Sequence, residues 1–184
     1  EERRQVTAGR RNTRSESYDW GTPVECVEAV REALGGRIAF DPCSNPWSVV
    51  GAEEELMIEN GDDGLAASWN RPTIFVNPPY GRDPDRGTSI DDWLSACRNA
   101  NARHGAEVVA LVPVATNTGH WKRHVWGRAA AICFLAAPRL PFLRYGERSG
   151  KGAPMACCAI YWGADVERFK AAFADLGATV SLRP

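Results

Sequence analysis

The sequence predicts an α/β fold with a doubly wound, mainly parallel sheet and an antiparallel edge. Two observations support this prediction. Short apolar runs typical of buried strands alternate along the chain with longer segments of helical character. Two of these runs also stop at polar residues and prolines, as strands do where they reach the ligand-binding edge of an open α/β sheet. Such alternation favours helices on both faces of one sheet.

The elements follow in order from local signals. Residues 1–17 are polar, rich in Arg and without periodicity, so we expect a mobile arm before a single domain over 18–184. The first helix is expected over 23–34, with Thr22 as N-cap and Pro23 at the first helical position. We expect strands near 38–41, 55–58, 73–77, 107–112, 130–136, 155–162 and 178–182, and further helices near 90–103, 118–127 and 164–176. The last two strands are expected to form the antiparallel edge.

Composition favours one compact enzyme domain in the cytoplasm. The chain has 184 residues, of which 44% are hydrophobic, so it can bury a core but has no room for a second domain of ordinary size. No apolar stretch approaches the roughly 20 residues that span a bilayer, and the charged start lacks a signal-peptide core. Six cysteines without a Cys-x-x-Cys pair are expected to be reduced packing residues, and no metal site is expected.

The most informative motif is Asn77-Pro78-Pro79-Tyr80, directly after the apolar run 74–76. The two prolines lack N–H groups and have a fixed φ, so they end the strand and hold its last carbonyls in a rigid turn. The Asn77 side chain adds an acceptor and Tyr80 adds a flat face. These groups are suited to hold a planar group that carries an NH₂, although a proline-stopped strand followed by a plain turn would give the same residues.

A second candidate site residue, Asp41, ends the run 38–40 and is followed by Pro42. Ligands of open α/β sheets bind at the carboxyl ends of strands, so Asp41 and Asn77 are expected to share one crevice. The loop after Asp41 has no glycine that would allow close backbone approach. Asn45 tolerates left-handed geometry and is expected to substitute for it in part.

Charge is unevenly distributed along the chain. Residues 53–63 carry six acids and no cation, whereas 121–151 are strongly basic and interleaved with aromatic residues. The basic stretch predicts contact with nucleic acid, or else a solvated charged face. The candidates for phosphate or base contact are Lys122, Arg123, Arg139, Arg144 and Arg148. The segment 81–92 has the Gly, Pro and Asp content of a loop and could form a lid over the site.

Taken together, these motifs resemble the phage-type DNA N6-adenine methyltransferases, which use S-adenosylmethionine. The resemblance covers about 145 of the 184 residues and rests on the order and spacing of several motifs. They are Trp20-Gly21-Thr22-Pro23, Asp41-Pro42-Cys43, Asp63-Gly64-Leu65 with Trp69, Asn77-Pro78-Pro79-Tyr80 with Trp93, Leu111-Val112-Pro113, Arg139-Leu140-Pro141-Phe142 and Ile160-Tyr161-Trp162-Gly163.

The resemblance implies a Rossmann-like methyltransferase fold and a role for each motif. Double-stranded DNA would be the partner, with the target adenine flipped out of the duplex. Asn77 Oδ1 and the Pro78 carbonyl would accept hydrogens from the adenine N6, Pro79 would hold the turn, and Tyr80 would stack on the base. The cofactor site would comprise Trp20, Thr22, Pro23, Asp41, Pro42, Asn45 and Asp63.

Two other classes of function remain compatible with the sequence. An Asn-Pro-Pro-Tyr turn can hold any planar NH₂ group, so the substrate could be an adenine of RNA or a glutamine amide of a protein. A non-catalytic nucleic-acid binder is the third possibility, because the missing glycines could signal a lost cofactor site.

Overall fold

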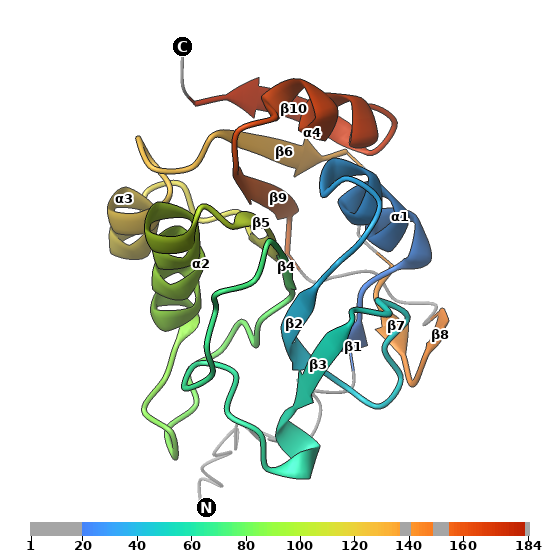
Figure 1. The fold of residues 1–184 in the computed structure, drawn as a ribbon, viewed down its shortest axis with the longest axis vertical. Helices are drawn as coiled ribbons and strands as arrows, with labels where there is room; N and C mark the ends of the chain where they lie inside the picture. The colour runs from blue at the N-terminus through green and yellow to red at the C-terminus, as the bar shows by residue number, and fades with distance from the viewer. Residues whose placement is uncertain (1–19, 137–140, 149–154, 183–184) are drawn as a thin grey trace, which may run out of the picture.

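The computed structural model describes residues 20–136, 141–148 and 155–182, so the predicted arm over 1–17 lies outside the described residues. Its centre is a seven-stranded sheet in the order β10-β6-β9-β5-β4-β2-β3 (Figure 1). The strands are β2 (Phe40–Ser44), β3 (Glu54–Met57), β4 (Thr73–Val76), β5 (Glu107–Pro113), β6 (Ala131–Leu135), β9 (Cys157–Trp162) and β10 (Gly177–Ser181). All seven predicted strands are therefore present.

The sheet is mixed. Neighbours among β3, β2, β4 and β5 run parallel, whereas β9 is antiparallel to both β5 and β6, and β10 is antiparallel to β6. The prediction of a mainly parallel sheet thus holds for one half of it. The prediction that the last two strands together form the edge is wrong for β9, which lies inside the sheet, and right for β10. Buried neighbours on both sides of β9 explain why its six residues are all buried.

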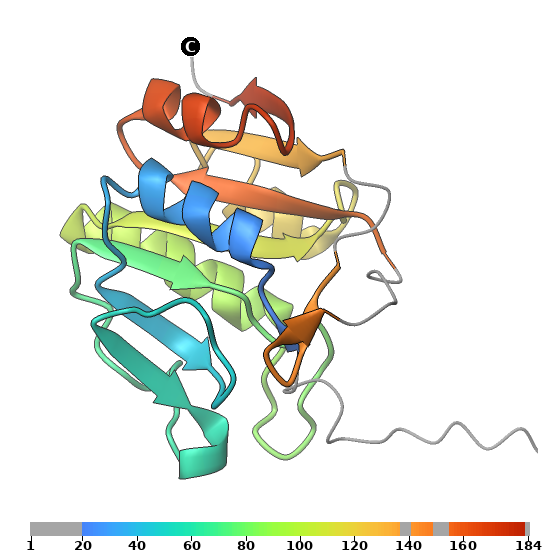
Figure 2. The same cartoon turned by 90° about the vertical axis from the view of Figure 1, so that its right-hand side faces the viewer.

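Helices cover both faces of the sheet. The helices α1 (Val24–Ala33) and α4 (Val166–Ala172) share one hydrophobic cluster, and α2 (Ile90–His104) and α3 (Gly119–His124) share the other. Figure 2 shows α1 in front of the sheet and α2 behind it. Side chains alternate between the two clusters along each strand, so Cys157 lies in the cluster of α1 and Cys158 in the cluster of α2. All six cysteines are free thiols.

Two local predictions are wrong at the residues that border the site. The N-cap of α1 is Pro23 and no side chain caps this helix, so Thr22 is not its cap. The Thr22 hydroxyl instead contacts Asn77, as described below. Strand β2 also continues through Asp41 and Pro42 to Ser44, because a register shift between Asp41 and Ser44 lets its pairing with β3 resume beyond the proline.

A small second sheet was not predicted. Strands β1 (Trp20–Gly21), β7 (Leu143–Arg144) and β8 (Glu147–Arg148) pair antiparallel in the order β1-β7-β8. Each has only two residues, which is too short for a recognisable period. This sheet lies on the side of the main sheet to which the arrowheads of β2 and β4 point (Figure 2).

Candidate active site

The candidate site lies where β2 and β4 end. These strands are parallel neighbours, so their carboxyl ends meet at one edge of the sheet. Asn77 directly follows β4, and Asp41 lies in the last part of β2. The structure therefore brings together the two residues that the sequence assigned to one crevice.

The side-chain amide of Asn77 is held at both ends. Its Nδ2 donates to Thr22 Oγ1 at 3.1 Å, and its Oδ1 accepts from the Tyr80 hydroxyl at 3.1 Å. Thr22 is only 4% exposed, so this partner is itself fixed by its surroundings. A carbonyl oxygen has two lone pairs, so Oδ1 can accept one further hydrogen bond after that from Tyr80. The amide is thus oriented before any substrate arrives.

Tyr80 is packed as well as bonded. Its hydroxyl lies 3.4 Å from the Leu111 carbonyl, and its ring meets the buried Phe142 edge to face, with centroids 6.2 Å apart. Burial raises the pKa of the Tyr80 hydroxyl well above its usual range. The hydroxyl therefore remains protonated and can donate to Asn77. The sequence predicted a stacking role for this ring, and the structure adds contacts that orient Asn77.

Asp41 is a buried carboxyl without a paired cation. It is 3% exposed, and its Oδ1 accepts from the Cys43 backbone N–H at 3.0 Å. Burial raises the pKa of Asp41 to about 7, and the negative charge of Glu55 adds to this effect. Within the described part of the chain, Asp41 has no ion pair. The nearby Ser44 hydroxyl lowers the pKa of Asp41 in part, but this hydroxyl is buried and makes no well-formed hydrogen bond. Asp41 and Ser44 are together suited to a ligand that brings hydrogen-bond donors or positive charge.

The expected left-handed Asn45 is wrong. Tyr145 is the one non-glycine residue with a positive φ among residues 20–136, 141–148 and 155–182. Asn45 instead turns the chain with its side chain, because its Oδ1 accepts from the Trp47 N–H at 3.0 Å. The close approach comes from another loop: a Cβ on Gly64 would lie 1.8 Å from the Pro42 carbonyl oxygen. Gly64 therefore allows the loop that contains Asp63 to pack closely against the backbone of the Asp41 loop.

Asp63 organises this neighbouring loop. Its Oδ1 accepts from the N–H groups of Leu65 and Ala66, at 3.1 and 3.3 Å. Trp69 closes the loop from the core side, with its Nε1 donating to the Gly64 carbonyl at 2.8 Å. Trp69 and Trp93 are both buried, and their rings pack against each other with centroids 6.3 Å apart. Asp63 also lines a narrow pocket next to the Asn77 turn, together with Ile58, Leu65, Pro79, Gly81, Asp83, Arg86, Thr88, Ser89 and Trp93.

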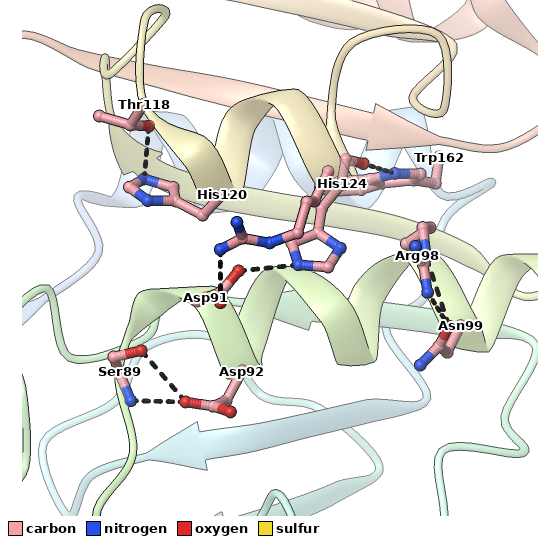
Figure 3. Close-up of polar contacts among 10 residues, drawn as sticks. Ser89, Asp91, Asp92, Arg98, Asn99, Thr118, His120, His124 and Trp162 are labelled. Carbon is pink, nitrogen blue, oxygen red and sulfur yellow. Dashed lines mark hydrogen bonds and ion pairs between the residues drawn. The ribbon is translucent and has the colours of Figure 1, made fainter.

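The segment 81–89 forms one wall of that pocket, so the predicted lid lies next to the site. Asp83 and Thr88 form a single antiparallel bridge across it, and Arg86 donates to the Asp62 carbonyl. Helix α2 begins directly after it with a capping box of Ser89 and Asp92 (Figure 3). These contacts tie the loop to the Asp62 carbonyl and to the start of α2.

The predicted basic residues fall into two separate groups. Lys122 and Arg123 lie on α3, whereas Arg144 and Arg148 lie on the β7–β8 hairpin at the opposite side of the molecule (Figure 1). Arg139 lies outside the described residues. The stretch 121–151 thus does not form one continuous basic surface, because the sheet stands between its two described parts.

Some of these charges already have partners. Asp91 accepts from Arg123 at 2.7 Å and contacts His124 Nε2 at 2.8 Å, which ties α2 to α3 (Figure 3). Arg148 pairs with Glu25 on α1. The guanidinium of Arg144 lies over the rings of Trp20 and Tyr145, 5.9 and 5.4 Å from their centroids.

Comparison with known families decides the class of the protein. Residues 10–171 match the model of the family described as DNA N-6-adenine-methyltransferase (Dam). The chain belongs to this family. Comparison with curated proteins and with solved structures gave no match. Membership of the Dam family supports methyl transfer to the N6 atom of adenine in DNA, and it places DNA as the substrate ahead of RNA or protein.

Among the described residues, no group of three or more His, Cys, Asp or Glu side chains is arranged to hold a metal ion. The helices in the same ranges include none that is long and apolar enough to cross a membrane.

Sequence reasoning missed several features around the site. The buried Ser44 hydroxyl was not predicted. Gly64 and Phe142 belong to motifs named above, but their contacts with Pro42 and Tyr80 join segments distant along the chain, which no local pattern reveals. Trp47 and Tyr145 are both exposed beside the site. A usable signal existed for the hairpin, because Tyr145-Gly146 stands where a two-residue turn needs a glycine.

Proposed function

We propose that this chain transfers the methyl group of S-adenosylmethionine to N6 of a target adenine in double-stranded DNA, at specific sites and in the cytoplasm of a bacterial or phage-infected cell. The observation that carries the proposal is the fixed amide of Asn77 at the carboxyl edge of β4, next to the uncompensated buried Asp41. The fold is compatible with a Rossmann-like methyltransferase, since both residues lie at the strand ends where such folds bind ligands.

Orientation of the amine is the main catalytic task. The lone pair of the adenine N6 is delocalised into the ring, so the amine is a weak nucleophile. Asn77 Oδ1 has one acceptor position left, and the Pro78 carbonyl is followed by Pro79, which has no N–H to donate to it. If both accept N6 hydrogens, the lone pair turns toward the methyl donor and positive charge developing on nitrogen is stabilised. Pro79 keeps the turn rigid, and the flipped base lies beside Tyr80.

The donor site is proposed around Asp41. S-adenosylmethionine supplies an electrophilic methyl group on a positively charged sulfur. An unpaired buried carboxyl and the orphaned Ser44 hydroxyl fit a ligand that carries an ammonium group and positive charge. We further propose that the cofactor site includes Trp20, Thr22, Pro23, Pro42, Asn45 and Asp63, each of which lies on a segment that borders the crevice. Asp63 also lines the pocket beside Pro79, where its carboxylate would accept a hydrogen bond from a ribose hydroxyl or an amino group of the cofactor.

Cations on the hairpin are proposed to hold the DNA backbone. Arg144 lies opposite Trp20 of β1, and Arg148 lies on the next strand, β8. Strand β1 leads into Thr22, which accepts a hydrogen bond from Asn77. Arg139 belongs to the same part of the sequence. Lys122 and Arg123 would contact only a more distant part of the duplex, because α3 lies on the other side of the sheet (Figure 1).

Transfer of a labelled methyl group to separate pools of DNA, RNA and protein tests this function. We expect label in DNA, recovered as N6-methyladenine. The Asn77→Ala variant should lose about 10²-fold or more in kcat with unchanged affinity for S-adenosylmethionine. Asn70→Ala, which changes an exposed asparagine outside the site, is the matched control and should behave as wild type.

Other outcomes would favour the other functions. Label mainly in RNA or protein would replace DNA as the substrate. An absence of calorimetric binding of S-adenosylmethionine would favour a nucleic-acid binder without catalysis. Normal turnover by Asn77→Ala would remove the central role of the amide.

A further inference from the structure

The tip of the β7–β8 hairpin has an unusual backbone. Arg144 pairs with Glu147, so two residues, Tyr145 and Gly146, make the turn. Both have positive φ, 52° and 77°, which defines a type I′ turn. The preferred first residue of such a turn is Asn, Asp or Gly, because a bulky side chain is strained in the left-handed region. Tyr145 therefore occupies a position where a bulky side chain disfavours the fold.

Tyr145 projects into solvent beside a second exposed aromatic residue. Tyr145 and Trp47 are each 49% exposed, and their rings meet edge to face with centroids 5.8 Å apart. The turn packs against Trp47 directly, since a Cβ on Gly146 would lie 3.5 Å from the Trp47 carbonyl oxygen. The Arg144 guanidinium lies over the Tyr145 ring and over Trp20. We name Trp47, Arg144 and Tyr145 the aromatic cluster.

The aromatic cluster borders the candidate active site through three separate connections. Trp47 belongs to the loop that follows Asp41. Arg144 is paired with Trp20 in β1, two residues before Thr22, whose hydroxyl holds Asn77. Phe142, at the base of the same hairpin, packs on Tyr80. Figure 2 shows the hairpin next to the ends of β2 and β4.

We propose that Tyr145 and Trp47 form a stacking surface for nucleobases of the DNA around the target adenine. This inference rests on the proposed function, and it adds residues that contact bases rather than phosphates. Exposed aromatic rings beside a stacked guanidinium match the planar bases and negative backbone of nucleic acid. Bases next to a flipped nucleotide lose a stacking neighbour, so a protein ring can take its place. The strained conformation of Tyr145 is explained if it positions the ring for this contact.

Replacement of Tyr145 by Asn separates stability from DNA binding. Tyr145→Asn creates the preferred Asn-Gly turn, so the midpoint of thermal unfolding should rise by about 2–4 °C. Affinity for a duplex that contains the target adenine should fall roughly 5- to 150-fold, which corresponds to the loss of one stacking contact. Because the lost ring is neutral, the slope of log K against log salt should stay unchanged. Trp47→Ala should weaken DNA binding in the same way, whereas Tyr145→Phe should retain it.

The control is Val180→Ala, which shortens a 48% exposed apolar side chain on β10, at the far edge of the sheet, and should leave DNA affinity unchanged. Wild-type affinity for DNA in both Tyr145→Asn and Trp47→Ala would overturn the inference. A loss of S-adenosylmethionine affinity in these variants, measured without DNA, would also overturn it by assigning the rings to the cofactor. If wild-type protein transfers no methyl group to DNA, the proposed function itself fails. If the wild-type protein methylates DNA and the two variants bind DNA with wild-type affinity, only the proposed stacking surface fails.

Discussion

Replacement of Asp41 by Asn should change how stability depends on pH. Asp41 is almost fully buried and unpaired, and burial raises its pKa from an ordinary value of 3.8 to about 7. An acid with a raised pKa in the folded state holds its proton more tightly there than in the unfolded chain. Its contribution to stability is therefore complete below pH 4 and is lost as the pH rises from about 4 to about 7. Asn keeps an oxygen that can accept from the Cys43 N–H but carries no charge.

The size of the effect follows from the shift. A difference of about three pH units corresponds to about 4 kcal/mol, at roughly 1.4 kcal/mol per unit. Between pH 5 and pH 8, the loss occurs over the two pH units from 5 to about 7. Ionisation of Asp41 should therefore lower the unfolding free energy of the wild type by roughly 3 kcal/mol across this range. Two histidines act in the opposite direction, because desolvation lowers the pKa values of the half-buried His120 and the buried His124, which removes stability as the pH falls. They are common to both proteins and cancel in the comparison.

Urea unfolding followed by tryptophan fluorescence would measure this difference, since the chain has seven tryptophans. Relative to wild type, Asp41→Asn should gain roughly 3 kcal/mol of unfolding free energy from pH 5 to pH 8. The same variant should bind S-adenosylmethionine more weakly, so stability would rise while function declines. Equal pH dependence in the two proteins would refute the reasoning, because it would mean that Asp41 ionises in the folded state without cost.

Three further predictions follow from the contacts around the site. Tyr80→Phe removes the hydroxyl that orients Asn77 and keeps the ring, so kcat should fall about 10-fold with little change in KM for DNA; steady-state kinetics would check this, and an unchanged kcat would leave stacking as the only role. Gly64→Ala should destabilise the fold by about 1–3 kcal/mol through the clash with the Pro42 carbonyl, measured by urea unfolding, while Gly81→Ala, with open space at its Cβ, should not. Binding titrations at several salt concentrations should show that Arg144→Ala lowers the salt slope by about 0.9, whereas Arg123→Ala, whose charge Asp91 already balances, changes it less.

The strands of the main sheet could be predicted from the sequence because their signals are local, whereas the two-residue strands β1, β7 and β8 could not. Each predicted strand is present within a few residues of its expected bounds, since apolar runs and their proline or glycine ends are read over short windows. The joint position of Asp41 and Asn77 could also be predicted, because residues at the ends of adjacent parallel strands must share an edge. The order of the strands in the sheet, by contrast, could not be predicted. The insertion of β9 between β5 and β6 depends on pairings between distant segments, and no local pattern specifies them.

At the candidate site, the sequence by itself determined which groups are available, namely an amide, a carboxyl, rigid proline carbonyls and aromatic rings. Only the tertiary structure decided how they are used. The Thr22 hydroxyl could have capped α1, yet it accepts from Asn77, 55 residues away, because packing of β1 beside the main sheet brings the two together. Gly64 likewise allows one loop to approach the Pro42 carbonyl of another loop. Tyr145 is exposed and strained because it lies in a hairpin turn. A side chain has several possible partners in sequence, and the free energy of the whole fold selects among them.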